Sequence, residues 1–320
     1  MTHDLQYLVD RAMEDTGTGG MRPVVEKELL HCDILFALQK GGFLDGLVFR
    51  GGTALRLCHG SPRFSEDLDF AGGADFTSTH LAPLADYLKD FLSGRYGLVV
   101  EVRPPATLRD TPDHANVTVE KWRLSVVTQP ANSAIPRQRI HLEIANVPSH
   151  ANELRLLERN YDFMPDGYMD MMIRVETKEE ILADKLVAFP AKLPTYVRWR
   201  DIWDIHWLGR KGVGEIADLV QAKTDDYGIE DLGGLLEAAT ARLPELARSG
   251  DFANEMERFL TDTVAERTIR TEGWLEAVAA EIRERLAGLR RDLAPRKYGV
   301  GDDYDDPFSI PDPFKPPRPW

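Results

Sequence analysis

The chain has 320 residues, of which 43% are hydrophobic and 29% are charged, and this composition suits a globular protein of one large or two ordinary domains. No stretch approaches the roughly 20 consecutive apolar residues of a membrane span, and the N-terminus lacks the basic and apolar regions of a secretory signal, so we expect a cytoplasmic protein with no membrane partner. The net charge of −14 argues against a uniformly basic nucleic-acid-binding surface, because such binding depends on neutralising phosphates.

The first half of the chain alternates between the hydrophobic patterns of helices and of strands. The expected elements are, in chain order, a helix over 22–41, a strand over 47–49, a short helix over 53–58, a strand over 67–70, a helix over 80–92, and strands over 98–102, 117–127 and 139–145. In the last strand Ile140, Leu142 and Ile144 fall on one face and Glu143 on the other. That alternation is typical of a sheet with one buried face.

The second half of the chain has the hydrophobic period of helices. Helices are expected over 178–189, 198–208, 214–222, 232–242, 252–266 and 274–293. Because the period changes between 148 and 176, we expect a catalytic domain over 1–150, a helical domain over 151–297 and a proline-rich acidic tail over 298–320. The predicted fold class is therefore α+β with two lobes, a mixed sheet flanked by helices and then a helical bundle, with the active site in the cleft between them.

A glycine turn after the strand over 47–49 has the character of a phosphate-binding loop. Gly51 and Gly52 let the backbone approach a bulky anion closely. A helix that begins at Thr53 would direct its free N–H groups and the positive end of its dipole at that anion. With the Thr53 hydroxyl as a further donor, the segment predicts a site for a nucleotide triphosphate. Arg56 and Arg63 could also neutralise phosphate, although arginines are common on surfaces.

Two aspartates on the next strand indicate a metal site. Asp67 and Asp69 are two residues apart, so both carboxylates project from the same face. They repel one another unless a cation lies between them, and Mg²⁺ prefers such oxygen ligands together with phosphates. One ion would bridge the triphosphate and a second would activate the attacking hydroxyl. Glu143 is the candidate third ligand, with an ordinary solvent-facing position as the alternative. Ser65 either shares this face and bonds to the nucleotide, or is a turn residue.

Two charged residues fall inside the apolar stripes of the expected helices. These are Lys185 and Asp201. A charge in such a place is costly without a partner, so the two either pair with one another or line a polar cleft. In the functional interpretation Lys185 contacts the triphosphate, and Asp201 orients Lys185 or the acceptor hydroxyl. A structural salt bridge is the alternative, and Asp204, which points aside, is a lesser candidate.

The segment from Phe49 to Phe70, FRGGTALRLCHGSPRFSEDLDF, resembles the AbiEii-type nucleotidyltransferase toxins of the DNA polymerase β-like nucleotidyltransferase superfamily. The signature of that superfamily is a glycine pair or Gly-Ser, then a gap, then Asp-x-Asp or Asp-x-Glu. AbiEii-type proteins also carry a helix with a key lysine and then an Arg-Asp-x-x-Asp helix. Here these correspond to Lys185 in ILADKL and to Asp201 in RDIWD, and the resemblance covers about residues 20–210.

The resemblance implies a magnesium-dependent enzyme that moves a nucleoside monophosphate from a nucleotide triphosphate to an acceptor hydroxyl and releases pyrophosphate. It further implies an RNA acceptor, such as a tRNA 3′ end, a cognate antitoxin, and a role in a toxin–antitoxin or phage-defence system. The basic and aromatic segment Tyr196–Arg200 is a candidate local site for RNA. Two alternatives remain open: the same chemistry on a small molecule or protein, which the acidic charge favours, and a nucleotide-binding interaction protein without turnover.

Overall fold

The computed structural model describes residues 4–16, 20–105, 117–132, 134–164, 167–168, 170–214 and 216–293. The tail expected over 298–320 lies outside these residues. Among the residues described, no helix has both the length and the apolar character that a membrane crossing requires.

A seven-stranded mixed sheet with the strand order β3-β4-β5-β2-β1-β7-β6 forms the first part of the structure. Its strands are β1 (Val48–Arg50), β2 (Leu68–Ala71), β3 (Val99–Arg103), β4 (Val119–Val127), β5 (Gln138–Ala145), β6 (Asn152–Leu156) and β7 (Met172–Glu176). The central strands β1 and β2 are antiparallel, whereas β2 pairs with β5, and β1 with β7, in parallel. The end of β1 and the beginning of β2 therefore meet in the middle of the sheet.

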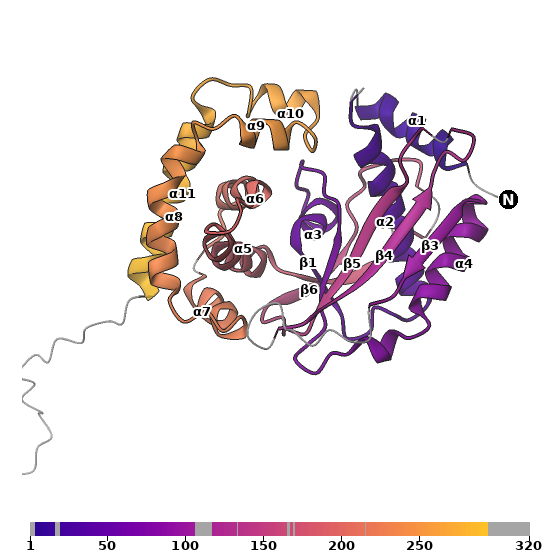
Figure 1. Cartoon of the computed structure of the whole chain (residues 1–320), viewed down its shortest axis with the longest axis horizontal. Helices are drawn as coiled ribbons and strands as arrows, with labels where there is room; N and C mark the ends of the chain where they lie inside the picture. Colours follow the sequence, from indigo (N-terminus) through magenta and orange to yellow (C-terminus); the bar gives the residue numbers. More distant parts are fainter. Residues whose placement is uncertain are drawn as a thin grey trace, which may run out of the picture.

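Helices flank the sheet and form the second half of the chain. The first four are α1 (Leu5–Thr16), α2 (Arg22–Lys40), α3 (Gly51–Cys58) and α4 (Leu84–Tyr96), with a short 3-10 turn at Ser78–Leu81. After β7 come α5 (Lys178–Lys192), α6 (Trp199–Arg210), α7 (Ala217–Asp226), α8 (Leu232–Leu246), α9 (Asp251–Met256), α10 (Asp262–Glu266) and α11 (Trp274–Leu293). Figure 1 shows the later helices on one side of the molecule and the sheet with α2 and α4 on the other. The predicted two-lobed α+β fold is confirmed.

The two faces of the sheet are covered differently. Helices α2 and α4 pack on one face, where Trp122, Leu124, Ile140 and Leu142 are buried in the main core. On the opposite face the described residues form a small apolar cluster: Val48, Ala71, Val117, Ala145 and Val147, with Val119 and Tyr227 packed against it. The rest of that face is therefore free to carry polar side chains.

Four elements of the structure differ from those expected from the sequence. Helix α1 and strands β6 and β7 were not predicted, and the helix expected over 252–266 is divided into α9 and α10. Leu154 and Leu156 of β6 are exposed, so this edge strand lacks the alternation that identifies a half-buried strand. Strands β6 and β7 lie in the segment 148–176, so the sheet extends past the domain division expected at residue 150.

Candidate active site

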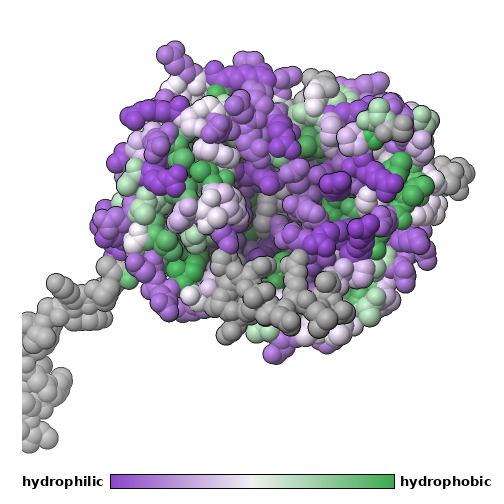
Figure 2. Space-filling view, viewed as in Figure 1, coloured by the Kyte–Doolittle hydropathy of each residue, from purple (hydrophilic) through white to green (hydrophobic). Residues whose placement is uncertain are grey.

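A cavity of about 840 Å³ lies between the sheet and the helical half, within the size range of small-molecule sites. Hydrophilic side chains surround the hollow between the two halves in Figure 2. The lining includes Gly51, Gly52, Ser65, Asp67, Asp69 and Glu143 from the sheet half, and Lys185, Arg198, Arg200 and Asp201 from the helices. The structure brings the predicted site residues to this one cavity except Thr53 and two lesser candidates, Asp204 and Arg56, of which Arg56 pairs with Glu28.

The glycine turn at the start of α3 has no room for side chains. Gly51 has a φ of +76°, and a Cβ there would lie 2.8 Å from Asp69 Oδ2. A Cβ at Gly52 would lie 2.5 Å from Arg63 Nη2 and 2.9 Å from Ser65 Oγ. The glycines thus allow the start of α3 to approach the carboxylate and the arginine closely, and its free N–H groups form a position for an anion.

Thr53 holds this turn in place from inside the protein. Helix α3 begins at Gly51, two residues before the start expected at Thr53. The Thr53 side chain is buried, and its hydroxyl donates a hydrogen bond to the backbone carbonyl of Asp67. In place of the expected bond to a nucleotide, this hydroxyl therefore fixes the glycine turn against the segment that carries Asp67.

Three carboxylates lie together on the open face of the sheet. In the parallel pair β2–β5, Asp69 is directly opposite Glu143, and Asp67 precedes β2 on the same face. Burial and the neighbouring charges of Glu143 and Asp67 raise the pKa of Asp69 to about 7. The pKa of Asp67 is also raised, chiefly by burial. The site therefore concentrates negative charge that a cation would offset.

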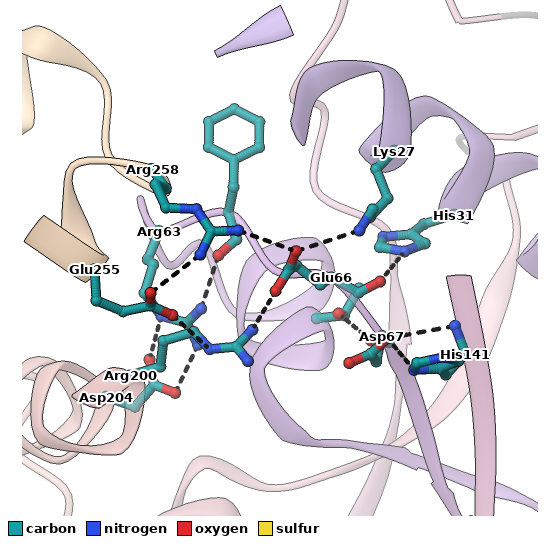
Figure 3. Close-up of polar contacts among 12 residues, drawn as sticks. Lys27, His31, Arg63, Glu66, Asp67, His141, Arg200, Asp204, Glu255 and Arg258 are labelled. Atoms are coloured by element: carbon teal, nitrogen blue, oxygen red, sulfur yellow. Dashed lines mark hydrogen bonds and ion pairs between the residues drawn. The ribbon is translucent and has the colours of Figure 1, made fainter. Parts of the chain in front are cut away.

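The side chains of these carboxylates are turned toward other partners in this structure. Asp67 Oδ1 accepts a 3.3 Å hydrogen bond from the His141 backbone N–H and lies 3.2 Å from His141 Nδ1 (Figure 3). Glu143 Oε1 lies 2.6 Å from Lys121 Nζ. Over the described part of the chain, no three His, Cys, Asp or Glu side chains converge as a metal site. By donor chemistry Asp67, Asp69 and Glu143 fit Mg²⁺, but holding it would require these side chains to turn toward one another.

A buried network of charges forms the helical wall of the cavity. Lys185 Nζ donates a 2.7 Å hydrogen bond to Asp201 Oδ1 and lies 2.9 Å from Asp204 Oδ2. Arg63 binds both oxygens of Asp204, at 2.9 and 2.7 Å, and Arg198 pairs with Asp201. Such a bidentate arginine–carboxylate pair is strong and directional. The network connects the segment after α3 with α5 and α6.

The opposite charges in this network stabilise one another. Burial alone would raise the pKa of Asp201, but the charges of Arg198 and Lys185 lower it to about 2. Burial would likewise lower the pKa of Lys185, yet Asp201 and Asp204 raise it above its ordinary value. Three cations therefore face two carboxylates, Asp201 and Asp204, which leaves one positive charge in excess beside the glycine turn.

The opposite end of the cavity is apolar. Val117, Val119 and Ala145 line it there and belong to, or pack against, the small apolar cluster of the open face; Val187 and Ala188 of α5 are further apolar residues of the lining. Beside it, the Tyr227 hydroxyl donates to Asp184 and accepts a 3.0 Å hydrogen bond from Arg50 Nη1. The cavity thus has a charged end next to the glycine turn and an apolar end bordered by a few polar groups, as sites for amphipathic small molecules do.

Glu66 links three separate segments next to the carboxylates (Figure 3). Its carboxylate lies 3.3 Å from Lys27 of α2, 3.2 Å from Arg200 of α6 and 3.9 Å from Arg258, which follows α9. Glu255 lies 3.1 Å from Arg258 on the other side. This arrangement of alternating charges holds helices of the second lobe against the segment that precedes Asp67.

Most of the chain matches a known family. Residues 33–284 match the family model described as "Nucleotidyl transferase AbiEii toxin, Type IV TA system". The chain belongs to the AbiEii family. It is therefore a nucleotidyltransferase toxin of a type IV toxin–antitoxin system, and the family implies an antitoxin as partner. The family identified from the sequence motifs is confirmed.

Two solved structures from Helicobacter pylori are similar to this AbiEii-family chain. One is JHP933, with 20% sequence identity, a TM-score of 0.45, and coverage of 84% of this chain and 93% of that protein. The other is described as a candidate nucleotidyltransferase, with 19% identity, a TM-score of 0.42, and coverage of 84% and 94%. No curated protein matches the sequence.

Two residues beside the cavity of this AbiEii-family chain are more central than the sequence indicated. Asp204 was placed second to Asp201, yet it is the residue that joins Arg63 to Lys185. Arg63 is buried rather than on the surface. The signal was present in part, because Arg198 and Asp201 have the i, i+3 spacing of a helical ion pair.

Proposed function

We propose that this chain transfers a nucleoside monophosphate from a nucleotide triphosphate to a 3′ hydroxyl of RNA, with a tRNA 3′ end as acceptor, and so acts as a toxin, including in phage defence. The observation that carries the proposal is the meeting of a glycine turn, three carboxylates and the basic side chains of Arg63 and Lys185 in one cavity. A triphosphate and a divalent cation together complement that combination of charges.

The polarity of the cavity suggests how the nucleotide lies in it. The triphosphate would bind the N–H groups at Gly51 and Gly52, with Lys185 and Arg63 as nearby positive charges. The base would lie toward the apolar end at Val119 and Ala145. This orientation places the α-phosphate next to the carboxylates of β2 and β5.

Asp67, Asp69 and Glu143 would hold magnesium in this reaction. When bound, the metal supplies charge stabilisation at the phosphate oxygens and lowers the pKa of a coordinated hydroxyl. The acceptor oxygen forms a bond to the α-phosphorus, the bond from that phosphorus to the bridging oxygen breaks, pyrophosphate leaves with the electron pair, and the hydroxyl proton passes to solvent. Lys185 and Arg63 offset the growing negative charge on the leaving pyrophosphate.

Asp201 would act through Lys185 rather than on the acceptor. Its two oxygens are engaged by Lys185 and Arg198, so it fixes the position of the ammonium group. We also propose that the sheet with its flanking helices is the catalytic lobe and that the later helices complete the cleft. Metal binding then falls to the sheet lobe, whereas phosphate binding uses Arg63 and the glycine turn of that lobe together with Lys185 of the other.

A labelling assay tests the proposed function. The purified chain is incubated with Mg²⁺, each α-labelled nucleotide triphosphate in turn, and total RNA, beside Asp67→Asn and an EDTA-treated sample. We expect label on RNA from the wild type only, with no label from a γ-labelled nucleotide. Label on RNA from Asp67→Asn or in EDTA would contradict the carboxylate assignment. Nucleotide binding without any transfer would favour an interaction protein without turnover.

A small molecule or protein acceptor is the second candidate. The net charge of −14 favours it, because the average field repels a polyanion. The same assay distinguishes the two acceptors when a protein fraction and a small-molecule fraction of the cell extract replace the RNA. Transfer to either fraction, but not to RNA, would support this candidate.

A further inference from the structure

The open face of β3, β4 and β5 carries basic side chains at neighbouring positions on adjacent strands. The strand register places Arg103 opposite Arg123, and Arg123 opposite His141. In the next row Glu101 is opposite Ser125, which is opposite Arg139. Side chains at these alternate positions project from the same face of a sheet, which is the face opposite the core residues of β4 and β5.

This face is basic although the chain is acidic. Among the residues that the structure describes, its charged side chains are Arg103, Lys121, Arg123, Arg137 and Arg139 against Glu101 and Glu143. We call these five basic residues, four arginines and one lysine, the arginine strip. Because the chain has a net charge of −14, a surface with more positive than negative side chains is unexpected from its composition. Figure 2 shows hydrophilic side chains over this part of the sheet.

The two central arginines of the strip are available to a ligand. Arg123 and Arg139 are exposed, and within the described ranges neither side chain takes part in a hydrogen bond or an ion pair. Arg103 and Arg137 are different, because Glu101 lies 2.7 Å from the first and 3.9 Å from the second. Exposed arginines without a carboxylate partner are suited to bind phosphate.

The strip leads directly to the candidate active site. Arg123 is opposite His141, whose ring lies 3.2 Å from Asp67. Lys121 is opposite Glu143 in the same way and forms an ion pair with it. A chain of phosphates that lies on Arg139 and Arg123 would therefore end next to the carboxylates, at the charged end of the cavity.

We propose that the arginine strip binds the sugar–phosphate backbone of the single-stranded 3′ end of the RNA acceptor and directs its terminal hydroxyl to Asp67. This inference rests on the proposed function, and it adds the surface by which an acidic protein binds a polyanion. Charge complementarity and continuity with the carboxylates favour RNA over an acidic protein as the occupant. The acceptor and the nucleotide then enter from different sides, since the apolar end of the cavity lies at Val119 and Ala145.

The test compares a variant that lacks two positive charges of the strip with a control variant that lacks two positive charges elsewhere. The strip variant is Arg123→Gln with Arg139→Gln. Its matched control is Arg283→Gln with Arg291→Gln on α11, where both arginines are exposed and have no side-chain ion pair with any residue described. Helix α11 lies at the opposite side of the molecule (Figure 1). A third variant, Arg123→Lys with Arg139→Lys, retains the charge.

The probe is a short labelled single-stranded RNA of mixed sequence with a free 3′ hydroxyl, and binding is measured by anisotropy over a range of salt concentrations. We expect the strip variant to bind about twentyfold more weakly at roughly 0.1 M salt, with the slope of log K against log salt reduced by about 1.4, because each phosphate contact contributes about 0.7. KM for the RNA should rise while kcat and nucleotide affinity stay unchanged. The control and the lysine variant should remain near wild type.

The outcomes separate this inference from the proposed function. If the wild type transfers label to RNA and the strip variant behaves like its control, the inference is overturned and the proposed function stands. If the wild type neither binds nor labels RNA, both are overturned. If the strip variant loses nucleotide affinity or melts well below its control, its weaker RNA binding does not report on the strip. The lysine variant then decides: the inference stands if that variant binds RNA like the wild type, and it is overturned if it does not.

Discussion

The ammonium group of Lys185 on α5 donates a 2.7 Å hydrogen bond to the carboxylate of Asp201 on α6. Both residues are buried, and both line the cavity. The sequence allowed two explanations for charges in the apolar stripes of these helices, mutual pairing or a polar cleft. The structure combines them, because the pair itself forms part of the cavity wall. The pair is therefore placed both to act in catalysis and to hold α5 and α6 together.

Replacing Lys185 with methionine separates these two roles. Asp201 retains Arg198 and Asp204 retains Arg63 in that variant, so neither carboxylate is left alone in the protein. We expect nucleotide transfer to fall by about 100-fold or more, as when one stabilising group is removed from a transition state, with weaker nucleotide binding. The measurement is transfer rate and nucleotide affinity on protein shown by circular dichroism to be folded. Full activity in the folded variant would assign Lys185 a structural role only.

Acid should remove part of the stability that Asp201 contributes. Its pKa is about 2 in the folded protein against an ordinary value of 3.8, so the folded state binds the proton less readily than the unfolded state. The contribution, on the order of 2 kcal/mol, is present above about pH 4 and is lost as the pH falls toward about 2. Urea unfolding of the wild type and Asp201→Asn should therefore show a difference that shrinks over this range. A difference that stays constant with pH would contradict the assignment.

The sequence identifies those site residues whose position is locally unusual. Gly51 and Gly52 stand out because they mark the change from a strand pattern to a helix pattern. Lys185 stands out because it is a charge within an apolar stripe. Both signals depend only on neighbours in the sequence. The cavity brings these residues together.

Other site residues depend on contacts between distant segments. His141 lies beside Asp67 because β2 and β5 pair in parallel in one register, and no local pattern specifies that register. Arg63 has no helical or strand period, and its burial follows from Asp204, which lies on α6. The edge of the sheet is a further example. Strand β6 was not predicted because its exposed leucines break the alternation of buried and exposed residues that identifies a strand.

Replacing Asp69 with asparagine should have opposite effects on stability and activity. Burial and the charges of Glu143 and Asp67 oppose ionisation of Asp69 and raise its pKa to about 7. Above that pH, removing the charge should raise the melting temperature of the metal-free protein, because repulsion is relieved. Transfer activity should be lost, and Mg²⁺ should no longer raise the melting temperature. The checks are thermal unfolding with and without Mg²⁺ and the labelling assay, and a variant that is less stable without metal would be inconsistent with repulsion among these acids.

A matched pair of glycine variants tests the close approach at the turn. Gly51 has a φ of +76° and Gly273 a φ of +75°, so alanine is strained by a similar amount at both positions, about 1 kcal/mol. A Cβ at Gly51 would also lie 2.8 Å from Asp69 Oδ2, whereas one at Gly273 would have nothing within 4 Å.

We therefore expect both alanine variants to lose a little stability, but only Gly51→Ala to lose transfer activity and nucleotide affinity. The loss follows because the added methyl group displaces Asp69 and obstructs the N–H groups at the start of α3. Thermal unfolding gives the shared effect of strain, and nucleotide titration with the labelling assay gives the difference. Equal activity of the two variants would show that the turn at Gly51 neither contacts the nucleotide nor positions Asp69.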